Sequence, residues 1–165
     1  NHHFCVLDSG GATGEKSVFT GDAFGLAYPA LQGGGLFIIP SSSPTDFDPN
    51  EAIAAVDRIA ASGAQVAYLT HFGPIRDVAA AAAQLKGHLR FMGALLDKAK
   101  TSPLGGGELA AVCRKSMRDY LEVELRKRGL GSDESAWRVL KLDCELNGDG
   151  IAWAARRLRG EFDRK

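Results

Sequence analysis

The first part of the chain alternates short apolar runs with glycine-rich and polar turns. Two strands are predicted on either side of the turn "DSGGATGEK". Their apolar residues lie at Phe4–Leu7 and in "SVFTGD" at residues 17–22. The run "LFIIP" at Leu36–Pro40 predicts a buried strand. A further strand is expected in "AQVAYLTH" at residues 64–71, where it ends at His71.

One helix is expected among these strands. In "SSSPTDFDPNEA", Asp48 suits the N-cap, Pro49 suits the first helical position and Glu51 completes a capping box. Apolar residues then recur at helical spacing as far as Gly63, which favours the end of a helix. The order strand, helix, strand with short connections predicts an α/β unit.

From residue 75 onward the apolar positions recur at helical spacing, and "TSPLGGG" at residues 101–107 interrupts them. The helices expected here are residues 75–100, residues 108–128 up to Gly129, a third capped by Ser132, and a fourth that begins near Asn147. We therefore predict two domains, an α/β domain at residues 1–74 and a helical C-terminal extension at residues 75–165.

Composition limits the partners. Apolar residues make up 45% of the chain and charged residues 24%, which is typical of a soluble globular protein. Lys plus Arg and Asp plus Glu number 20 each, so no net field attracts nucleic acid or an anionic membrane, and we expect neither partner. The uncharged stretch 23–45 contains prolines and glycines and does not predict a membrane span. Basic residues crowd the C-terminus from Arg156 onward, which predicts a solvated helix end.

The three cysteines, Cys5, Cys113 and Cys144, lie far apart and form no C-x-x-C pair. This spacing disfavours both a disulfide framework and a zinc knuckle. Cys5 lies in an apolar run and is expected to be a core residue. A reducing, cytoplasmic setting is the expectation that follows.

The candidate chemistry lies at two strand ends. Asp22 in "VFTGDAFG" and His71 each follow a predicted strand, and strand ends of an α/β sheet converge on one edge where ligands bind. A carboxylate oxygen and an imidazole nitrogen together suit a metal ion. The residues alone leave a second interpretation open, in which Asp22 is a turn residue and His71 a polar loop residue.

Several segments resemble one family. "VFTGDAFG" and, about fifty residues later, "AQVAYLTHFGP" resemble the second half of the metallo-β-lactamase-fold hydrolases. "NHHFCVLD" resembles the strand after that family's G-H-A metal-binding loop, and "LDCELNGDGIAWAARRL" resembles the helical tail of a cytoplasmic branch. The resemblance implies an α/β fold, the C-terminal half of an αβ/βα sandwich followed by a helical C-terminal segment.

The same resemblance implies a metal centre. Asp22 would be the carboxylate that bridges two divalent metal ions and so the catalytic residue, and His71 would be the last histidine ligand. Zinc is the first expectation, with iron and manganese as alternatives, because all three accept these ligands. A carboxylate has two oxygens and can hold two cations close together.

The implied function is a metal-dependent hydrolase. A metal-bound hydroxide would attack an acyl ester or a thioester, with a lactone or a phosphoester as further candidate substrates. The alternative function is a non-catalytic binding or dimerisation module on a truncated hydrolase fold. Under that alternative the amphipathic helices would bind a partner or form a homodimer.

The chain departs from the family at its main ligand motif, because H-x-H-x-D-H does not occur in these residues. The four histidines are His2, His3, His71 and His88. We therefore expect this chain to be inactive by itself and to need the missing N-terminal half of the same protein as its partner. His2 or His3 would be a metal ligand, a residue that hydrogen-bonds to a metal ligand, or a surface residue, and His88 would be a helix-face residue. Tyr28 and residues 41–43 near Asp22 are candidates for substrate contact or for a structural role.

Overall fold

The computed structural model describes residues 5–8, 14–41, 47–131 and 133–162, and for residues 5–8 it describes the backbone only. Several residues named above, His2, His3, Ser42, Ser43 and Ser132, therefore lie outside the described residues, as does the side chain of Cys5.

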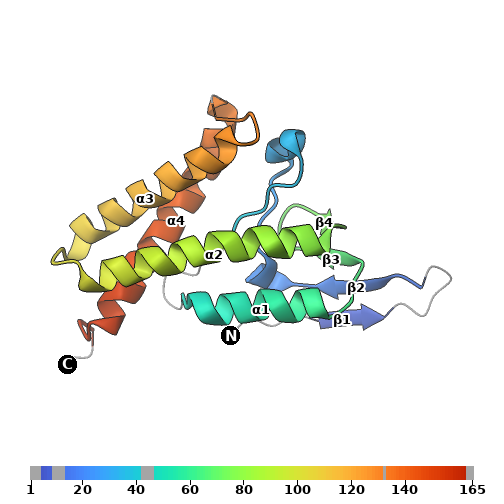
Figure 1. Cartoon of the computed structure of the whole chain (residues 1–165), viewed down its shortest axis with the longest axis horizontal. Coiled ribbons are helices and arrows are strands. Elements are labelled where there is room, and N and C mark those ends of the chain that lie inside the picture. The colour runs from blue at the N-terminus through green and yellow to red at the C-terminus, as the bar shows by residue number, and fades with distance from the viewer. Residues whose placement is uncertain (1–4, 9–13, 42–46, 132, 163–165) are drawn as a thin grey trace. The chain divides into compact units, whose positions relative to one another are not determined.

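The chain forms two compact units. The first, here called the sheet unit, contains residues 1–41 and 50–89, and the second, here called the helical unit, contains residues 42–49 and 90–165. The long helix α2 (Val78–Thr101) contributes residues to both units (Figure 1).

The sheet unit contains one four-stranded sheet in the order β1-β2-β3-β4. Its strands are β1 (Cys5–Asp8), β2 (Lys16–Phe19), β3 (Val66–Tyr68) and β4 (Pro74–Ile75). Strands β2 and β3 run parallel, while β1 with β2 and β3 with β4 run antiparallel. The central parallel pair therefore needs a crossover connection, which the chain supplies between residues 20 and 65.

Helix α1 (Pro49–Ala61) lies within that crossover. Pro49 occupies the first helical position, as predicted, and Gly63 follows the helix with φ 71°, a conformation that glycine adopts without strain. Lys86 of α2 donates to Asp57 of α1 at 2.7 Å, which agrees with the side-by-side course of these helices in Figure 1. The predicted order of strand, helix and strand is thus present in the sheet unit.

The strand predicted at Leu36–Pro40 does not form. Phe37, Ile38 and Ile39 are buried as expected, but the backbone of this run makes only an isolated bridge between Leu26 and Ile39. The side chain of Gln84 completes the pairing, because its Oε1 accepts from Ile38 N at 3.0 Å and its Nε2 donates to Leu36 O at 2.8 Å. A helix side chain therefore replaces the neighbouring strand that the prediction required.

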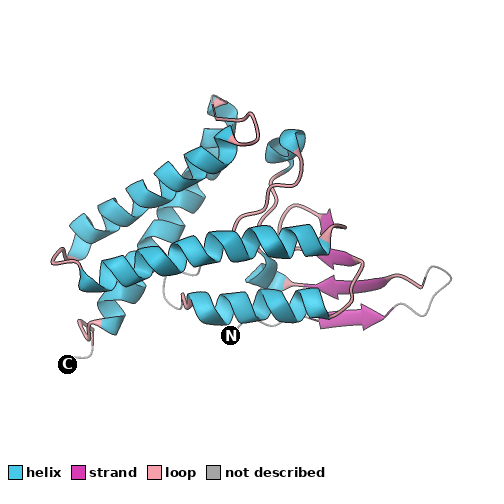
Figure 2. Cartoon of the chain, in the orientation of Figure 1, coloured by secondary structure: helices cyan, strands magenta, loops and turns pink. Residues whose placement is uncertain are grey.

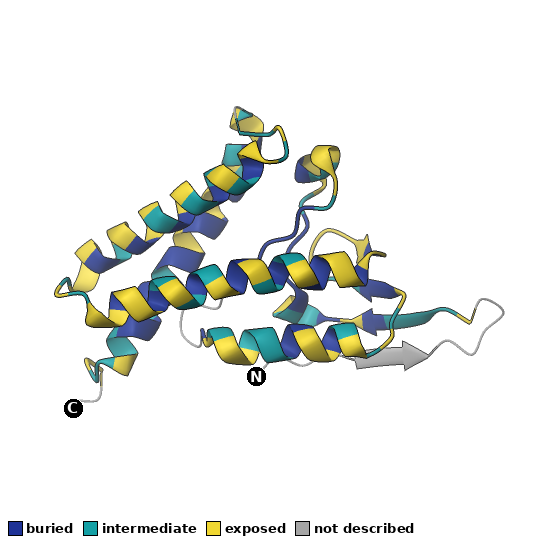
Figure 3. Ribbon diagram, viewed as in Figure 1, coloured by how far each residue is buried: buried dark blue, intermediate teal, exposed yellow. Residues whose placement is uncertain are grey.

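Three helices dominate the helical unit: the second part of α2, α3 (Gly106–Arg126) and α4 (Glu134–Leu158). On α3 the buried residues recur about every fourth position, as Figure 3 shows for one side of the helix. Their identities are Leu109, Cys113, Met117, Leu121 and Leu125. None of the helices among the described residues is both long enough and apolar enough to cross a membrane.

Helix α4 corrects the prediction of separate third and fourth helices. It is continuous through Asn147 and Gly148, which are both buried. A Cβ atom on Gly148 would lie 2.6 Å from Arg114 Cα, so the glycine lets α3 and α4 approach closely rather than ending a helix. The N-cap of α4 is Asp133, whose side chain accepts from the backbone of Ser135 and Ala136.

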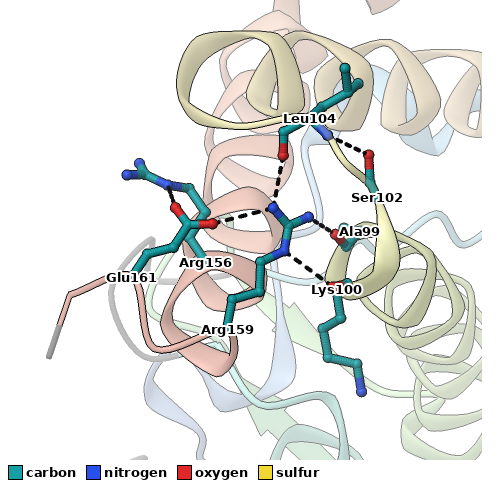
Figure 4. A network of polar contacts seen from close by, with 7 residues as sticks. All are labelled: Ala99, Lys100, Ser102, Leu104, Arg156, Arg159 and Glu161. Carbon is teal, nitrogen blue, oxygen red and sulfur yellow. Dashed lines mark hydrogen bonds and ion pairs between the residues drawn. The ribbon is translucent and has the colours of Figure 1, made fainter.

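The C-terminal basic cluster is not merely solvated. Arg159 donates to the backbone carbonyls of Ala99, Lys100 and Leu104, at 3.1 Å for Lys100 and 2.7 Å for Leu104 (Figure 4). The guanidinium therefore satisfies carbonyl groups at the C-terminal end of α2, where a cation also suits the helix dipole. Glu161 binds both Arg156 and Arg159. Arg164 and Lys165 lie outside the described residues.

The predicted fold class is wrong. The four strands contain four, four, three and two residues, whereas helices α1 to α4 contain 13, 24, 21 and 25 residues (Figure 2). Such short strands form one narrow sheet, not the broad faces that a sandwich packs against each other. The described chain is therefore mostly helical and is not the C-terminal half of an αβ/βα sandwich.

Candidate functional site

Asp22 and His71 follow the carboxyl ends of the two parallel strands. Strand β2 ends at Phe19 and strand β3 ends at Tyr68, and these two residues are paired in the sheet. Thr20 continues the pairing beyond the strand end, because its backbone N donates to Tyr68 O at 3.0 Å. Both connections therefore leave the sheet at the same edge, which is where ligands bind in open α/β sheets.

The turn that carries Asp22 is fixed by its neighbours. Thr20 is fully buried, and its Oγ1 donates to Tyr68 O at 3.2 Å and to Gly21 O at 3.0 Å. A short 3-10 helix, η1 (Gly21–Phe24), follows and leaves Asp22 exposed. Gly25 ends this helix at φ 72°, and a Cβ atom there would lie only 2.2 Å from Ile39 O. The backbone on both sides of Asp22 is thus held by specific contacts.

His71 lies in the connection between β3 and β4. Leu69 N donates to Gly73 O at 3.4 Å, which closes a tight turn around the histidine. Phe72 in this turn has φ 69°. Among the described residues it is the only one other than glycine with a positive φ. This conformation costs free energy for a residue with a bulky side chain, and strained residues cluster at functional sites.

The two predicted ligands lie together. His71 Nε2 is 4.0 Å from Asp22 Oδ1, and each side chain is 56% exposed. Two ligands about 2.0–2.1 Å from one tetrahedral zinc ion stand about 3.3–3.4 Å apart. A small rotation of either exposed side chain brings the pair to that separation. The structure thus places the two candidate metal ligands side by side.

No third ligand joins them from the described residues. No group of three or more His, Cys, Asp or Glu side chains able to hold a metal ion occurs in the part of the chain that the structure describes. His88 on α2 is only 2% exposed and lies edge-on to Phe37, with ring centroids 6.2 Å apart, which indicates a packed core histidine. The described residues therefore offer two candidate metal ligands, Asp22 and His71, and do not form a complete metal site.

Aromatic side chains lie near His71, which contacts the ring of Phe72. The ring of Phe72 lies 4.4 Å from the ring of Tyr28 and 6.1 Å from that of His71. At the ends of β2 and β3, Phe19 stacks on Tyr68 with centroids 5.0 Å apart. Phe19 and Phe72 are each 47% exposed, so apolar surface faces solvent close to the candidate ligands.

A small pocket of about 20 Å³ is lined in part by Asp22. Its wall includes Pro40 and Ser41, together with Val56 of α1 and Leu85 of α2. This volume holds about one water molecule and no organic substrate. Any substrate near Asp22 would therefore lie on the open edge of the sheet.

Sequence reasoning missed a second candidate site, in the helical unit. A groove of about 500 Å³ lies between α3 and α4, and we call it the basic groove. It is lined chiefly by Arg114, Lys115, Arg118, Trp137, Arg138 and Lys141. The signal available in the sequence was the helical spacing of these cations around Trp137, which is half-buried.

The helical unit also holds two buried free cysteines. Burial raises the pKa of Cys113 and of Cys144 to about 11 each. Both thiols therefore stay protonated near neutral pH, and a protonated thiol is neither a nucleophile nor a metal ligand.

Comparisons with family models, curated proteins and solved structures find no match to this chain. The resemblance to metallo-β-lactamase-fold hydrolases therefore rests on the residues quoted for it.

Proposed function

We propose that Asp22 and His71 supply two ligands to the metal centre of a metal-dependent hydrolase. The observation that carries this proposal is the 4.0 Å separation of the imidazole Nε2 and the carboxylate Oδ1 at one edge of the sheet. The donor set fits zinc, iron or manganese, because each accepts imidazole and carboxylate ligands. Both side chains are exposed enough to approach an ion from solvent.

The protein residues have distinct roles in this proposal. His71 offers a ring nitrogen, and the tight turn at Leu69–Gly73 limits the directions in which that nitrogen points. Asp22 offers two oxygens, so one can bind an ion while the other accepts a hydrogen bond from a water molecule or binds a second ion. When bound, a divalent ion lowers the pKa of a coordinated water and supplies a nucleophile near neutral pH.

Two ligands are fewer than the three protein ligands that catalytic zinc sites use. We therefore propose that the remaining ligands come from a separate segment of the complete protein, and that this chain by itself hydrolyses nothing. Cys113 and Cys144 do not fill the deficit, because both thiols are buried and protonated. The same free thiols support a reducing, cytoplasmic setting.

The aromatic surface supports an acyl ester or thioester as the substrate. Phe72 and Tyr28 present exposed or half-exposed rings next to His71, and such rings bind apolar groups. The strained backbone of Phe72 is consistent with a functional placement of its ring, because strain persists where the surroundings impose it. An apolar acyl chain on these rings would carry its carbonyl carbon toward Asp22 and His71.

The test uses the complete protein that contains this chain, purified without chelators. We expect about two divalent ions per chain by elemental analysis and hydrolysis of a medium-chain acyl thioester. Asp22→Ala should lose most of the metal and the activity, because it removes both carboxylate oxygens. Asp57→Ala is the matched control, since that carboxylate binds Lys86 on the surface of the same unit. Full metal occupancy in Asp22→Ala would contradict the proposal.

A further inference from the structure

The basic groove has the size of a small-molecule site. Its volume of about 500 Å³ falls in the range of roughly 300–1,000 Å³ that ligand pockets occupy. Its lining comes from α3 and α4, so it lies entirely within the helical unit. The groove shares no residue with the proposed hydrolase site.

The groove carries an excess of positive charge. Five cationic side chains and two acidic ones line it. Two of the cations are neutralised by acids, because Arg114 binds Asp149 through two hydrogen bonds of 2.6 and 2.9 Å and Lys115 binds Asp119 at 2.5 Å. These pairs fix part of the wall and leave the remaining cations to define its charge.

The other cations are not neutralised. Arg138 and Lys141 are exposed and form no ion pair with any residue that the structure describes. They stand three residues apart on α4, where like charges on one face destabilise a helix. Glu134 and Glu145 line the same groove, but neither forms an ion pair with Arg138 or Lys141. Both cations therefore remain available to an anion that enters the concave surface.

An aromatic surface adjoins the positive pair. Trp137 lies four residues before Lys141 on the same face of α4, and it lines the groove together with Arg138 and Lys141. Arg118 of α3 places its guanidinium carbon 5.5 Å from the centroid of that ring. The buried thiol of Cys144 adds an uncharged part of the wall. The groove thus offers a flat stacking surface next to unpaired cations.

From this arrangement we propose that the basic groove binds a nucleoside phosphate, an organic anion that joins a planar aromatic ring to phosphate groups. Trp137 stacks on the base, and Arg138 and Lys141 bind the phosphate oxygens. Glu134 and Glu145 line the same groove and accept hydrogen bonds from amino or hydroxyl groups of the nucleoside. No covalent step is part of this proposal.

The test titrates the 165-residue chain with ATP at low ionic strength. Binding is measured by isothermal titration calorimetry and by tryptophan fluorescence. Trp153→Phe leaves Trp137 as the single tryptophan, since the chain has two. We expect saturable quenching of this fluorescence, and affinity that falls as salt is added. Arg138→Ala combined with Lys141→Ala should weaken ATP binding by roughly tenfold or more, because charged hydrogen bonds are lost.

The controls separate this site from general attraction of anions. Arg90→Ala combined with Lys98→Ala removes two exposed cations of α2 outside the groove and should leave the affinity unchanged. Adenosine and tripolyphosphate should each bind more weakly than ATP, because each lacks one half of the recognised chemistry. Tripolyphosphate that binds as tightly as ATP, or an unchanged affinity in the Arg138→Ala, Lys141→Ala protein, would overturn the proposal. Circular dichroism of each variant checks that the helices persist.

Discussion

At the residue scale, the side chains of the candidate metal site owe their placement to backbone conformations that few residues adopt. Gly21 has φ 53° and begins the turn that exposes Asp22, and Phe72 has φ 69° in the turn that carries His71. Buried Thr20 links both turns through its two hydrogen bonds to Tyr68 O. The pair is therefore brought together by the backbone, before any ligand contributes.

The buried cysteines give a residue-scale prediction for alkaline pH. The pKa of Cys113 and of Cys144 rises from 9.0 to about 11 on burial, so the folded chain holds these protons more tightly than the unfolded chain does. Their contribution to the free energy of unfolding is therefore complete below about pH 9 and is lost as the pH rises towards 11. The urea midpoint, measured between pH 7 and pH 10.5, should fall over this window.

The double variant Cys113→Ala, Cys144→Ala is the comparison. It should be less stable at pH 7, because two buried side chains become smaller, but its urea midpoint should fall less between pH 9 and pH 10.5. Tyr120, whose pKa burial raises to about 12, titrates in both proteins and so cancels in the comparison. Equal falls in the two proteins would refute the role assigned to the thiols.

At the element scale, the contact between α3 and α4 depends on a glycine inside a helix. A Cβ atom at position 148 would lie 2.6 Å from Arg114 Cα and 2.7 Å from Arg114 N, which are backbone atoms that cannot rotate away. Helical propensity alone favours alanine over glycine by about 1 kcal/mol. The contact and the propensity therefore oppose each other, and their balance can be measured.

Gly148→Ala should lower the free energy of unfolding by about 1–3 kcal/mol, the usual cost of overpacking. Gly87→Ala makes the same change within α2, where nothing lies within 4 Å of the added Cβ atom. That control should raise stability by up to about 1 kcal/mol. Urea denaturation of the two variants measures both effects, and a stabilising Gly148→Ala would show that α3 and α4 do not approach as described.

The helices were more predictable than the strands, for reasons visible in single residues. Apolar spacing and Pro49 located α1, and the same spacing located α2 and α3, because a helix makes its hydrogen bonds within one segment. The hydrogen-bonding partner of a strand cannot be deduced from that strand's own sequence. The sequence "LFIIP" therefore could not predict that the side chain of Gln84 would bind its backbone. The "NGDG" segment led to the wrong prediction that one helix ends and another begins near Asn147. In the sequence, a glycine needed for close packing cannot be told from a glycine that ends a helix.

The two candidate sites also differed in how far they could be predicted from the sequence. The closeness of Asp22 and His71 could be predicted because two strand ends of a parallel pair meet at one edge, a rule that operates across the fold. The basic groove was missed because its lining comes from two helices whose mutual register no local pattern fixes. Arg159 shows the same limit, since its partners on α2 are about sixty residues away in sequence.

At the scale of the whole molecule, the two units have different chemistry. The sheet unit holds the exposed carboxylate–imidazole pair with its aromatic neighbours, and the helical unit holds the basic groove. The formal net charge of the chain is zero, so the positive groove is a local feature that overall composition conceals. Each proposal can be tested through variants of one unit while the other unit serves as an internal reference for folding.

The central claim is that Asp22 and His71 bind one divalent ion together, and zinc titration of the 165-residue chain tests it most directly. The measurement follows the histidine ring signals by NMR in a His2→Gln, His3→Gln background, in which His71 and His88 are the two histidines of the sequence. We expect the His71 ring signals to shift with zinc, the signals of buried His88 to stay constant, and Asp22→Asn to weaken zinc binding by about tenfold or more. The account would be contradicted if the His71 ring signals did not shift on addition of zinc, or if they shifted equally at the same zinc concentrations in Asp22→Asn.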